Sequence, residues 1–99
     1  MMLKIADVTL HDHEFRVSGD LDFNNVVGVY DKAVSSFGEC ADLVFDFAGV
    51  TSSNSAGIAL MIELVKKARL QGKCIKFKKL SDDIGSLLTA SGLDELIDY

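Results

Sequence analysis

Residues 43–58 read LVFDFAGVTSSNSAGI, and this stretch decides the fold. The run from 43 to 47 is apolar except for Asp46, and its Val and Phe content predicts a central strand covered on both faces. Residues 48–57 are small and mostly polar, which predicts a loop that leads straight into a helix. A strand, a loop and a helix in this order form part of a β-α-β unit, so an α/β domain is expected.

Periodicity assigns the elements before this stretch. Residues 3–10 and 14–21 alternate between apolar and polar side chains, which predicts two strands joined as a hairpin by a polar turn. Asp22 is expected to cap a helix whose apolar positions recur every three or four residues and which Gly38 closes. The apolar stripe of that helix consists of Val26, Val29, Tyr30, Ala33, Val34 and Phe37.

The same rules assign the elements after it. Residues 73–80 alternate as a strand, Ser81 is expected to cap a third helix over residues 82–90, and Gly92 ends that helix. The predicted order is β-β-α-β-α-β-α in an α/β fold, with a mixed sheet of four to five strands and helices mainly on one face. The second helix ends at Gly72, and its predicted buried stripe consists of Ile58, Met61, Ile62, Val65 and Ala68.

Composition restricts the function classes. The 99 residues suit a single domain over residues 1–99, and the hydrophobic fraction of 48% argues against disorder. No apolar run approaches the ~20 residues of a membrane span, and residues 1–7 do not resemble a secretory signal, so a cytoplasmic protein is expected. The net charge of −5 argues against nonspecific DNA binding. Cys40 and Cys74 lack metal-ligand spacing and are expected to be reduced thiols.

The chain lacks the patterns of common active sites. It has no GxSxG or GxxxxGK[ST] motif, and its two histidines, His11 and His13, fall in the predicted hairpin turn. A nucleophile needs a base within hydrogen-bond reach, so no catalytic residue and no cofactor are predicted. His11, His13 and Glu14 could bind a metal ion, but a solvated turn is the preferred interpretation, and no metal site is predicted.

Most of the basic residues fall between residues 66 and 79. The preferred interpretation is a solvated face that complements the negative end of a helix dipole, and the alternative is contact with an anionic lipid surface or another protein. The residues concerned are Lys66, Lys67, Arg69, Lys73, Lys76, Lys78 and Lys79.

Two polar segments offer candidate binding residues. Asp20 and Asp22 could form a carboxylate pair or contact a partner, although helix capping by Asp22 is the simpler interpretation. Asn54 or Ser55 is expected to cap the second helix. The start of that helix could instead hold a phosphate, because free N–H groups and the helix dipole point toward it. The small residues 56 and 57 would let a partner backbone approach closely.

Four motifs in this order resemble the STAS domain family, which includes sulfate-transporter tails and anti-sigma factor antagonists. Ser18-Gly19-Asp20-Leu21-Asp22 resembles the family's G-[ED]-L-D, and residues 43–50 resemble its strand LDLSGV. Asn54-Ser55-Ala56-Gly57-Ile58 resembles the DSSGL that starts the second helix, and Thr89-Ala90-Ser91-Gly92-Leu93 resembles the SGL after the last helix. The resemblance covers residues 14–97 and implies a SpoIIAA-like STAS fold.

Within this family, residues 57–65 and 68–72 are most similar to MlaB, the small cytoplasmic subunit of the Mla phospholipid transporter. The similarity implies an accessory subunit that binds the ATPase subunit of an ABC complex, at the inner face of the inner membrane. Leu60 and Leu64 are four residues apart and are expected to form an exposed apolar ridge at the contact. The other expected contact residues are Asp22, Ser52, Ser53, Asn54, Ser55, Ala56 and Gly57.

The alternative is an anti-sigma factor antagonist that binds a serine kinase and is switched by phosphorylation of Ser55. The resemblance implies this because Ser55 matches the serine that is phosphorylated in the antagonists. A phosphate adds about −1.5 to −2 charges and would disrupt the contact by repulsion and desolvation. Asn54 replaces the Asp that is usual in the family, which slightly favours a binding role for the Ser55 hydroxyl over phosphorylation. Both roles are non-catalytic.

Overall fold

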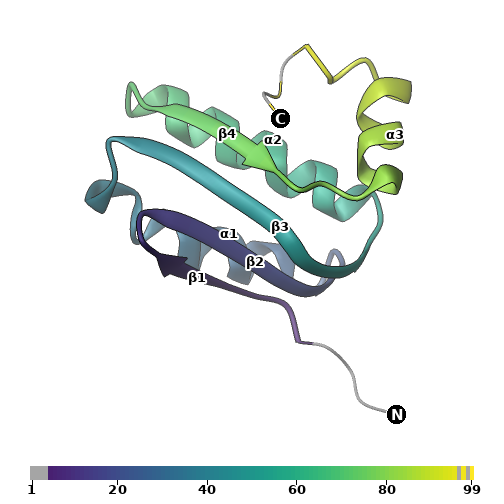
Figure 1. Ribbon diagram of the computed structural model, residues 1–99, viewed down its shortest axis with the longest axis horizontal. Helices are drawn as coiled ribbons and strands as arrows, with labels where there is room; N and C mark the ends of the chain where they lie inside the picture. The colour runs from purple at the N-terminus through teal and green to yellow at the C-terminus, as the bar shows by residue number, and fades with distance from the viewer. Residues whose placement is uncertain (1–4, 96, 98) are drawn as a thin grey trace.

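The chain folds in the predicted order β-β-α-β-α-β-α, which can be followed in Figure 1. The computed structural model describes residues 5–95, 97 and 99. The α-helices are α1 (Val26–Val34), α2 (Ser55–Leu70) and α3 (Asp82–Ala90), and a 3-10 helix, η1 (Phe37–Glu39), precedes the third strand. The strands are β1 (Asp7–His11), β2 (Glu14–Leu21), β3 (Asp42–Ser53) and β4 (Cys74–Lys78).

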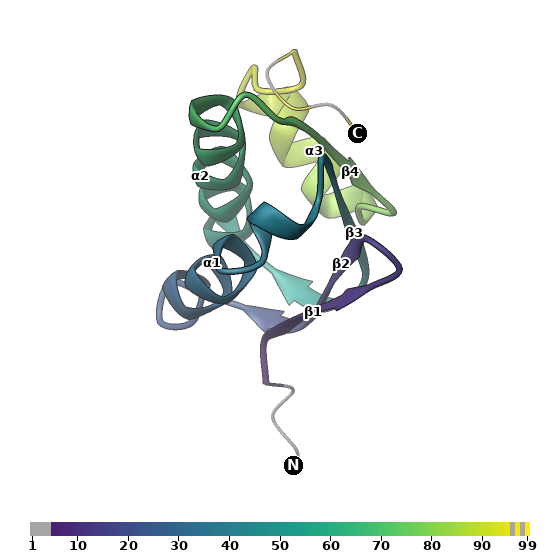
Figure 2. The same cartoon turned by 90° about the vertical axis from the view of Figure 1, so that its left-hand side faces the viewer.

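The strands form one mixed sheet of four strands in the order β1-β2-β3-β4, which confirms the predicted fold class. β1 pairs antiparallel with β2, whereas β2 with β3 and β3 with β4 are parallel pairs. Figure 2 shows α1 and α2 together on one side of the sheet. α3 follows β4 and contacts α2. Because β2, β3 and β4 are parallel, their carboxyl ends lie at one edge, where the three helices begin.

A row of aromatic rings forms the centre of the core. Phe15, Phe45 and Phe77 occupy the same level of β2, β3 and β4. Phe15 and Phe45 stack with their ring centroids 4.6 Å apart, and the centroids of Phe45 and Phe77 are 5.6 Å apart. Phe37 of η1 meets both Phe15 and Phe45 edge-on. All four rings are buried, and their contacts fix the register of the three strands.

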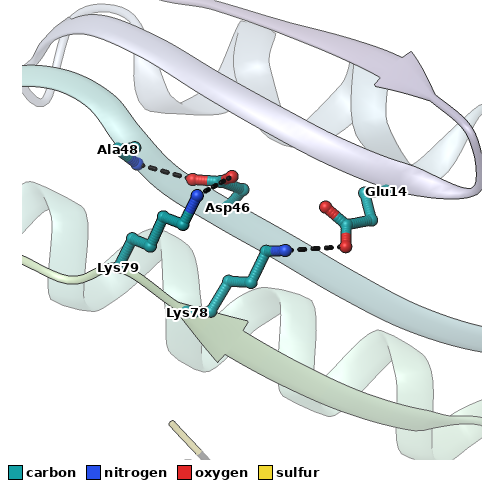
Figure 3. A network of polar contacts seen from close by, with 5 residues as sticks. All are labelled: Glu14, Asp46, Ala48, Lys78 and Lys79. Atoms are coloured by element: carbon teal, nitrogen blue, oxygen red, sulfur yellow. Dashed lines mark hydrogen bonds and ion pairs between the residues drawn. The ribbon is translucent and has the colours of Figure 1, made fainter.

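The opposite face of the sheet carries charged side chains. Figure 3 shows Lys78 reaching over β3 to Glu14, with its Nζ 2.7 Å from Oε1. Asp46 is only 8% exposed, accepts a 2.8 Å hydrogen bond from the Ala48 N–H and lies 3.7 Å from the Nζ of Lys79. Residues 43–47 are buried except for half-buried Val44, as expected for a covered central strand. α1 and α2 cover one face, and paired charged side chains lie over the other.

Several predicted boundaries are wrong. β3 continues to Ser53, so residues 48–53 are strand and not loop, and they pair with β2 through two register shifts. α1 ends at Val34, and Gly38 lies in η1 and not at the end of α1. β1 begins at Asp7. Residues 3 and 4 of the predicted first strand lie outside the described residues.

The starts and ends of α2 and α3 follow the predicted signals. The Ser81 hydroxyl caps α3 by accepting a 3.2 Å hydrogen bond from the Ile84 N–H, as predicted. Gly72 and Gly92 adopt φ values of +66° and +70° just after α2 and α3, where the chain must turn away from the helix. Over the residues that the structure describes, no helix combines the length and apolar character that crossing a membrane requires.

Gly19 of β2 provides a test of the packing beside the edge where the helices begin. Its φ is +87°, and a Cβ at this position would lie 2.6 Å from the carbonyl carbon of Ile5. We predict that Gly19→Ala lowers the free energy of unfolding by about 1–3 kcal/mol, because it combines left-handed backbone with a backbone collision.

Gly28→Ala on α1 is the matched control, since a Cβ on Gly28 would have no neighbouring atom within 4 Å. This change is expected to raise the free energy of unfolding by about 0.4–1 kcal/mol. Urea denaturation measures both variants. Equal stabilities for the two would contradict the close approach of residue 5 to Gly19.

Candidate functional site

Two polar segments that are far apart in sequence meet at the carboxyl ends of β2 and β3. Asp20 is level with Ser52, and Leu21 is level with Ser53, in the parallel pairing of the two strands. The Thr51 hydroxyl donates a hydrogen bond to the Asp20 carboxylate and ties the segments together. We call residues 20–22 and 51–55 the carboxyl edge. The two STAS-like motifs that precede the first and second helices therefore form one surface.

The β2–α1 connection is a closed set of short hydrogen bonds. Asp22 Oδ1 accepts hydrogen bonds from the N–H groups of Asn24 at 2.8 Å and Asn25 at 3.1 Å. Asn25 Oδ1 accepts from the Asp22 N–H at 3.0 Å, and Asn25 Nδ2 donates to the Asp20 carbonyl at 2.8 Å. Asp22 thus organises the turn before α1, whereas the N-cap position is Asn25. The predicted helix cap at Asp22 is wrong because three turn residues separate it from Val26.

Asn54 supplies the cap of α2. Its Oδ1 accepts a 2.8 Å hydrogen bond from the Ala56 N–H, which satisfies one of the free donors at the helix start. Ser55 is the first residue of α2 and is exposed, as are Ser52 and Asn54. From the sequence, either Asn54 or Ser55 could cap α2, and in the structure the cap is Asn54. The Ser55 side chain is therefore at the surface without being the helix cap.

Ala56 and Gly57, which are expected from the sequence to lie at the partner contact, are both buried. Ala56 is 0% exposed. A Cβ on Gly57 would collide with the Ser53 hydroxyl and would lie 3.7 Å from Leu21 Cδ1. These small residues therefore let α2 start close to the ends of β2 and β3. The exposed and half-buried members of the carboxyl edge are Asp20, Asp22, Thr51, Ser52, Ser53, Asn54 and Ser55.

Leu60 and Leu64 are also buried, so the prediction of an exposed apolar ridge is wrong. Leu60 is 2% exposed and Leu64 is 0% exposed. α2 contacts α1, α3, β3 and β4. Because α2 has neighbours on several sides, the buried part of its circumference is wider than the single apolar stripe predicted from the sequence. Ile62, a member of the predicted buried stripe, instead lies at the border of this buried part and is half-buried.

Sequence reasoning missed two exposed apolar residues beside the carboxyl edge. Phe23, in the turn before α1, is 62% exposed, and Val27 in the first turn of α1 is 65% exposed. They are four residues apart, and neither belongs to the buried stripe of α1. Their sequence signal is that two apolar residues, four apart, lie outside the apolar stripe predicted to face the core, which indicates an exposed apolar pair.

The remaining candidate residues lie away from the carboxyl edge. His11 and His13 are exposed at the β1–β2 turn, at the opposite end of β2, about 20 Å from the carboxyl edge at the rise of a β-strand. Neither histidine can therefore serve as a base for Ser55. Among the described residues, no group of three or more His, Cys, Asp or Glu side chains is placed to hold a metal ion. Cys40 is buried, Cys74 is exposed, and both are free thiols.

Several cations of the segment from 66 to 79 have partners within the fold. Lys66 lies 3.3 Å from Glu63, and the Lys73 ammonium donates a hydrogen bond to the Cys40 carbonyl. Lys78 and Lys79 pair with acids of β2 and β3 on the open face of the sheet, as Figure 3 shows. The contacts of Lys66 and Lys79 involve exposed ammonium groups, so these two pairs contribute little to stability.

A mixed four-stranded sheet with the motifs Gly19-Asp20-Leu21-Asp22 and Asn54-Ser55-Ala56-Gly57 side by side at its carboxyl edge is typical of a STAS domain. The family model described as "Mlab, STAS domain" matches residues 6–98. The chain therefore belongs to the MlaB-type STAS family. A search of curated proteins finds no significant match.

Solved structures with the same fold include anti-sigma factor antagonists. SpoIIAA in its unphosphorylated form has a TM-score of 0.72 at 14% identity, over 94% of this chain and 85% of that one. The Bacillus cell fate determinant SpoIIAA in its phosphorylated form has a TM-score of 0.67 at 14% identity, over 94% and 88%. An anti-sigma factor antagonist from Mycobacterium paratuberculosis has a TM-score of 0.65 at 18% sequence identity, over 94% of this chain and 81% of that one. At these identities the likeness establishes the fold alone.

The capping assignment can be tested separately from any binding role. We predict that Asn54→Ala lowers the free energy of unfolding by about 1 kcal/mol, because it removes the cap of α2. Ser55→Ala is the matched control and should change stability by less than about 0.5 kcal/mol, as expected for an exposed helical position. Thermal and urea melts of both variants provide the measurement. A larger loss from Ser55→Ala than from Asn54→Ala would show that the cap is misassigned.

Proposed function

We propose that this protein is a non-catalytic STAS domain that binds a protein partner through the carboxyl edge, with Ser55 at the centre of the contact. The observation that carries the proposal is the exposed Ser55 at the first position of α2, flanked by exposed Ser52 and Asn54 and by half-buried Asp22. In this proposal residues 1–99 are one domain. The MlaB-type family match over residues 6–98 supports it.

The partner is the ATPase subunit of an Mla-type phospholipid-transport ABC complex. The support is the description of the matching family model together with the resemblance of residues 57–65 and 68–72 to MlaB. The protein then resides in the cytoplasm, held at the inner face of the inner membrane by its partner.

The geometry of the carboxyl edge favours binding over catalysis. Both histidines lie at the far end of β2, so Ser55 has no imidazole base, and a serine hydroxyl is a weak nucleophile without one. What the edge offers is a set of short polar side chains on a rigid frame. The Asp20–Thr51 hydrogen bond and the Asp22–Asn25 pair hold the frame, so little entropy is lost when a partner docks.

Substitutions at Ser55 test this surface. We predict that Ser55→Arg and Ser55→Asp abolish copurification with the ATPase subunit of the same organism, because a long or charged side chain would be forced into a desolvated contact. Ser55→Ala should weaken binding by roughly 1–3 kcal/mol if the hydroxyl bonds the partner. Calorimetric titration of purified ATPase subunit measures the affinities.

Ser35→Arg is the matched control. Ser35 is an exposed serine at the carboxyl-terminal end of α1, at the opposite end of the sheet from Ser55. This variant should bind as the wild type does, and all variants should keep the wild-type melting profile. Wild-type affinity for Ser55→Arg would rule out the carboxyl edge as the functional surface.

A phosphorylation switch is the second candidate function. It is favoured by one observation: SpoIIAA, whose fold this chain shares, was solved in a phosphorylated form, and Ser55 is exposed at the start of α2. A helix start is a favourable place for a phosphate because of its free N–H groups and its dipole. The partner would then be an anti-sigma factor serine kinase.

Incubation with that kinase and ATP, followed by intact-mass measurement, separates the two functions. A switch predicts one added phosphate that Ser55→Ala removes and Ser35→Ala retains. It also predicts that Ser55→Ala binds the kinase constitutively, whereas Ser55→Asp does not. Strong binding to the ATPase subunit without any phosphate transfer would favour the transporter subunit.

A further inference from the structure

The amino-terminal halves of α1 and α2 enclose an apolar groove with a volume of about 360 Å³. Its apolar lining comes from Val26, Val27 and Tyr30 of α1 and from Ala59 and Leu60 of α2. We call it the α1–α2 groove. Val27 on its rim is 65% exposed, and the neighbouring Phe23 is 62% exposed. Exposed apolar side chains beside an apolar hollow are typical of an interaction site.

The groove is continuous with the carboxyl edge. Ser55, Ala59 and Glu63 are spaced by four residues along α2, so they lie one above another on the same side of the helix. Ala59 and Glu63 also line the groove, and each step along this line is about 6 Å at the rise of an α-helix. A partner seated on Ser55 therefore reaches the apolar lining within one helical turn.

Carboxylates flank the groove at the end away from Ser55. Asp31 of α1 and Glu63 of α2 both line it, and both are exposed. Glu63 lies 3.3 Å from Lys66, but the two side chains are 57% and 65% exposed, and a pair this exposed is weak. A cation placed between Asp31 and Glu63 would therefore gain two carboxylate neighbours at little cost.

We propose that the α1–α2 groove binds a segment of the partner ATPase subunit that carries an aliphatic or aromatic side chain next to a Lys or Arg. The apolar side chain packs on Val27, Tyr30 and Ala59, which are the exposed and half-buried apolar residues of the lining, and the cation lies between Asp31 and Glu63. This inference rests on the proposed function, because it extends the Ser55 contact along α2. It names two chemical features that the contact segment of the partner must have, in a fixed order along the groove.

The apolar part is tested by Val27→Gln, with Leu70→Gln as its matched control. Both residues are exposed aliphatic side chains, but Leu70, 83% exposed, lies at the far end of α2. Val27→Gln should weaken binding of the purified ATPase subunit about tenfold in calorimetric titrations, because a buried apolar contact becomes polar. Leu70→Gln should bind as the wild type does.

The charged part is tested by Asp31→Lys, with Glu39→Lys as its matched control. Glu39 is an exposed acid of η1 at the opposite end of the sheet, and both substitutions change the net charge equally. Asp31→Lys should weaken binding at least tenfold in low salt, and the difference should shrink as salt screens the charges. Glu39→Lys should have little effect at any salt concentration.

Ser55→Arg is measured in parallel so that the two proposals can fail separately. Loss of binding in Ser55→Arg together with wild-type binding in Val27→Gln and Asp31→Lys would overturn the groove and leave the carboxyl edge intact. Wild-type binding in all three would overturn the proposed function itself. A dimer of the isolated protein that Val27→Gln dissociates, seen by sedimentation, would assign the groove to a second copy and would also overturn the inference.

Discussion

The stacking of Phe15 on Phe45 is the contact on which the rest of the structure depends. The two rings lie 4.6 Å apart and nearly parallel, and Phe77 continues the row onto β4. Side chains alternate along a strand with a period of two, so a slip of one residue would expose these rings and bury charged neighbours. Two register shifts farther along the same strand pair, between Arg16 and Ser18 and between Gly19 and Asp20, then bring Asp20 level with Ser52. Packing in the core thus fixes the register at the middle of the sheet, and the two shifts set the geometry of the carboxyl edge.

Elements with local signals could be predicted from the sequence, and elements that depend on distant partners could not. The bounds of β2 and the cap of α3 were predictable because alternation and Ser81 are local features. The extension of β3 through residues 51–53 was not, because these polar residues become strand only by pairing with the end of β2. The burial of Leu60 had the same cause, since it depends on where α1 packs against α2.

In the candidate site, too, features with a local sequence signal could be predicted, and features that depend on distant residues could not. The residue pattern predicted Ser55 at the start of α2, and the structure places it there, exposed. The pattern could not show that Ala56 and Gly57 are buried, because helix position alone does not reveal, for example, that Ser53 and Leu21 lie against Gly57. It also gave no sign of the α1–α2 groove, whose two walls come from helices that are separated in sequence by η1 and the whole of β3.

Acidic residues occur in both parts of the proposed surface, the carboxyl edge and the α1–α2 groove. The chain carries a net charge of −5. Lys66 lies in the second half of α2, and Lys78 and Lys79 lie on the open sheet face, each beside an acid. The surface along α1 and residues 55–63 of α2 contains Asp22, Asp31 and Glu63, and its single cation, Lys32, lies 2.6 Å from Asp7. A basic partner segment would be attracted to this side of the molecule before any contact forms. Electrostatic complementarity of this kind raises association rates and selects the orientation of the partner more than it raises affinity. The apolar lining of the groove and the Ser55 contact would then determine how long the complex lasts, because short-range contacts act mainly on dissociation.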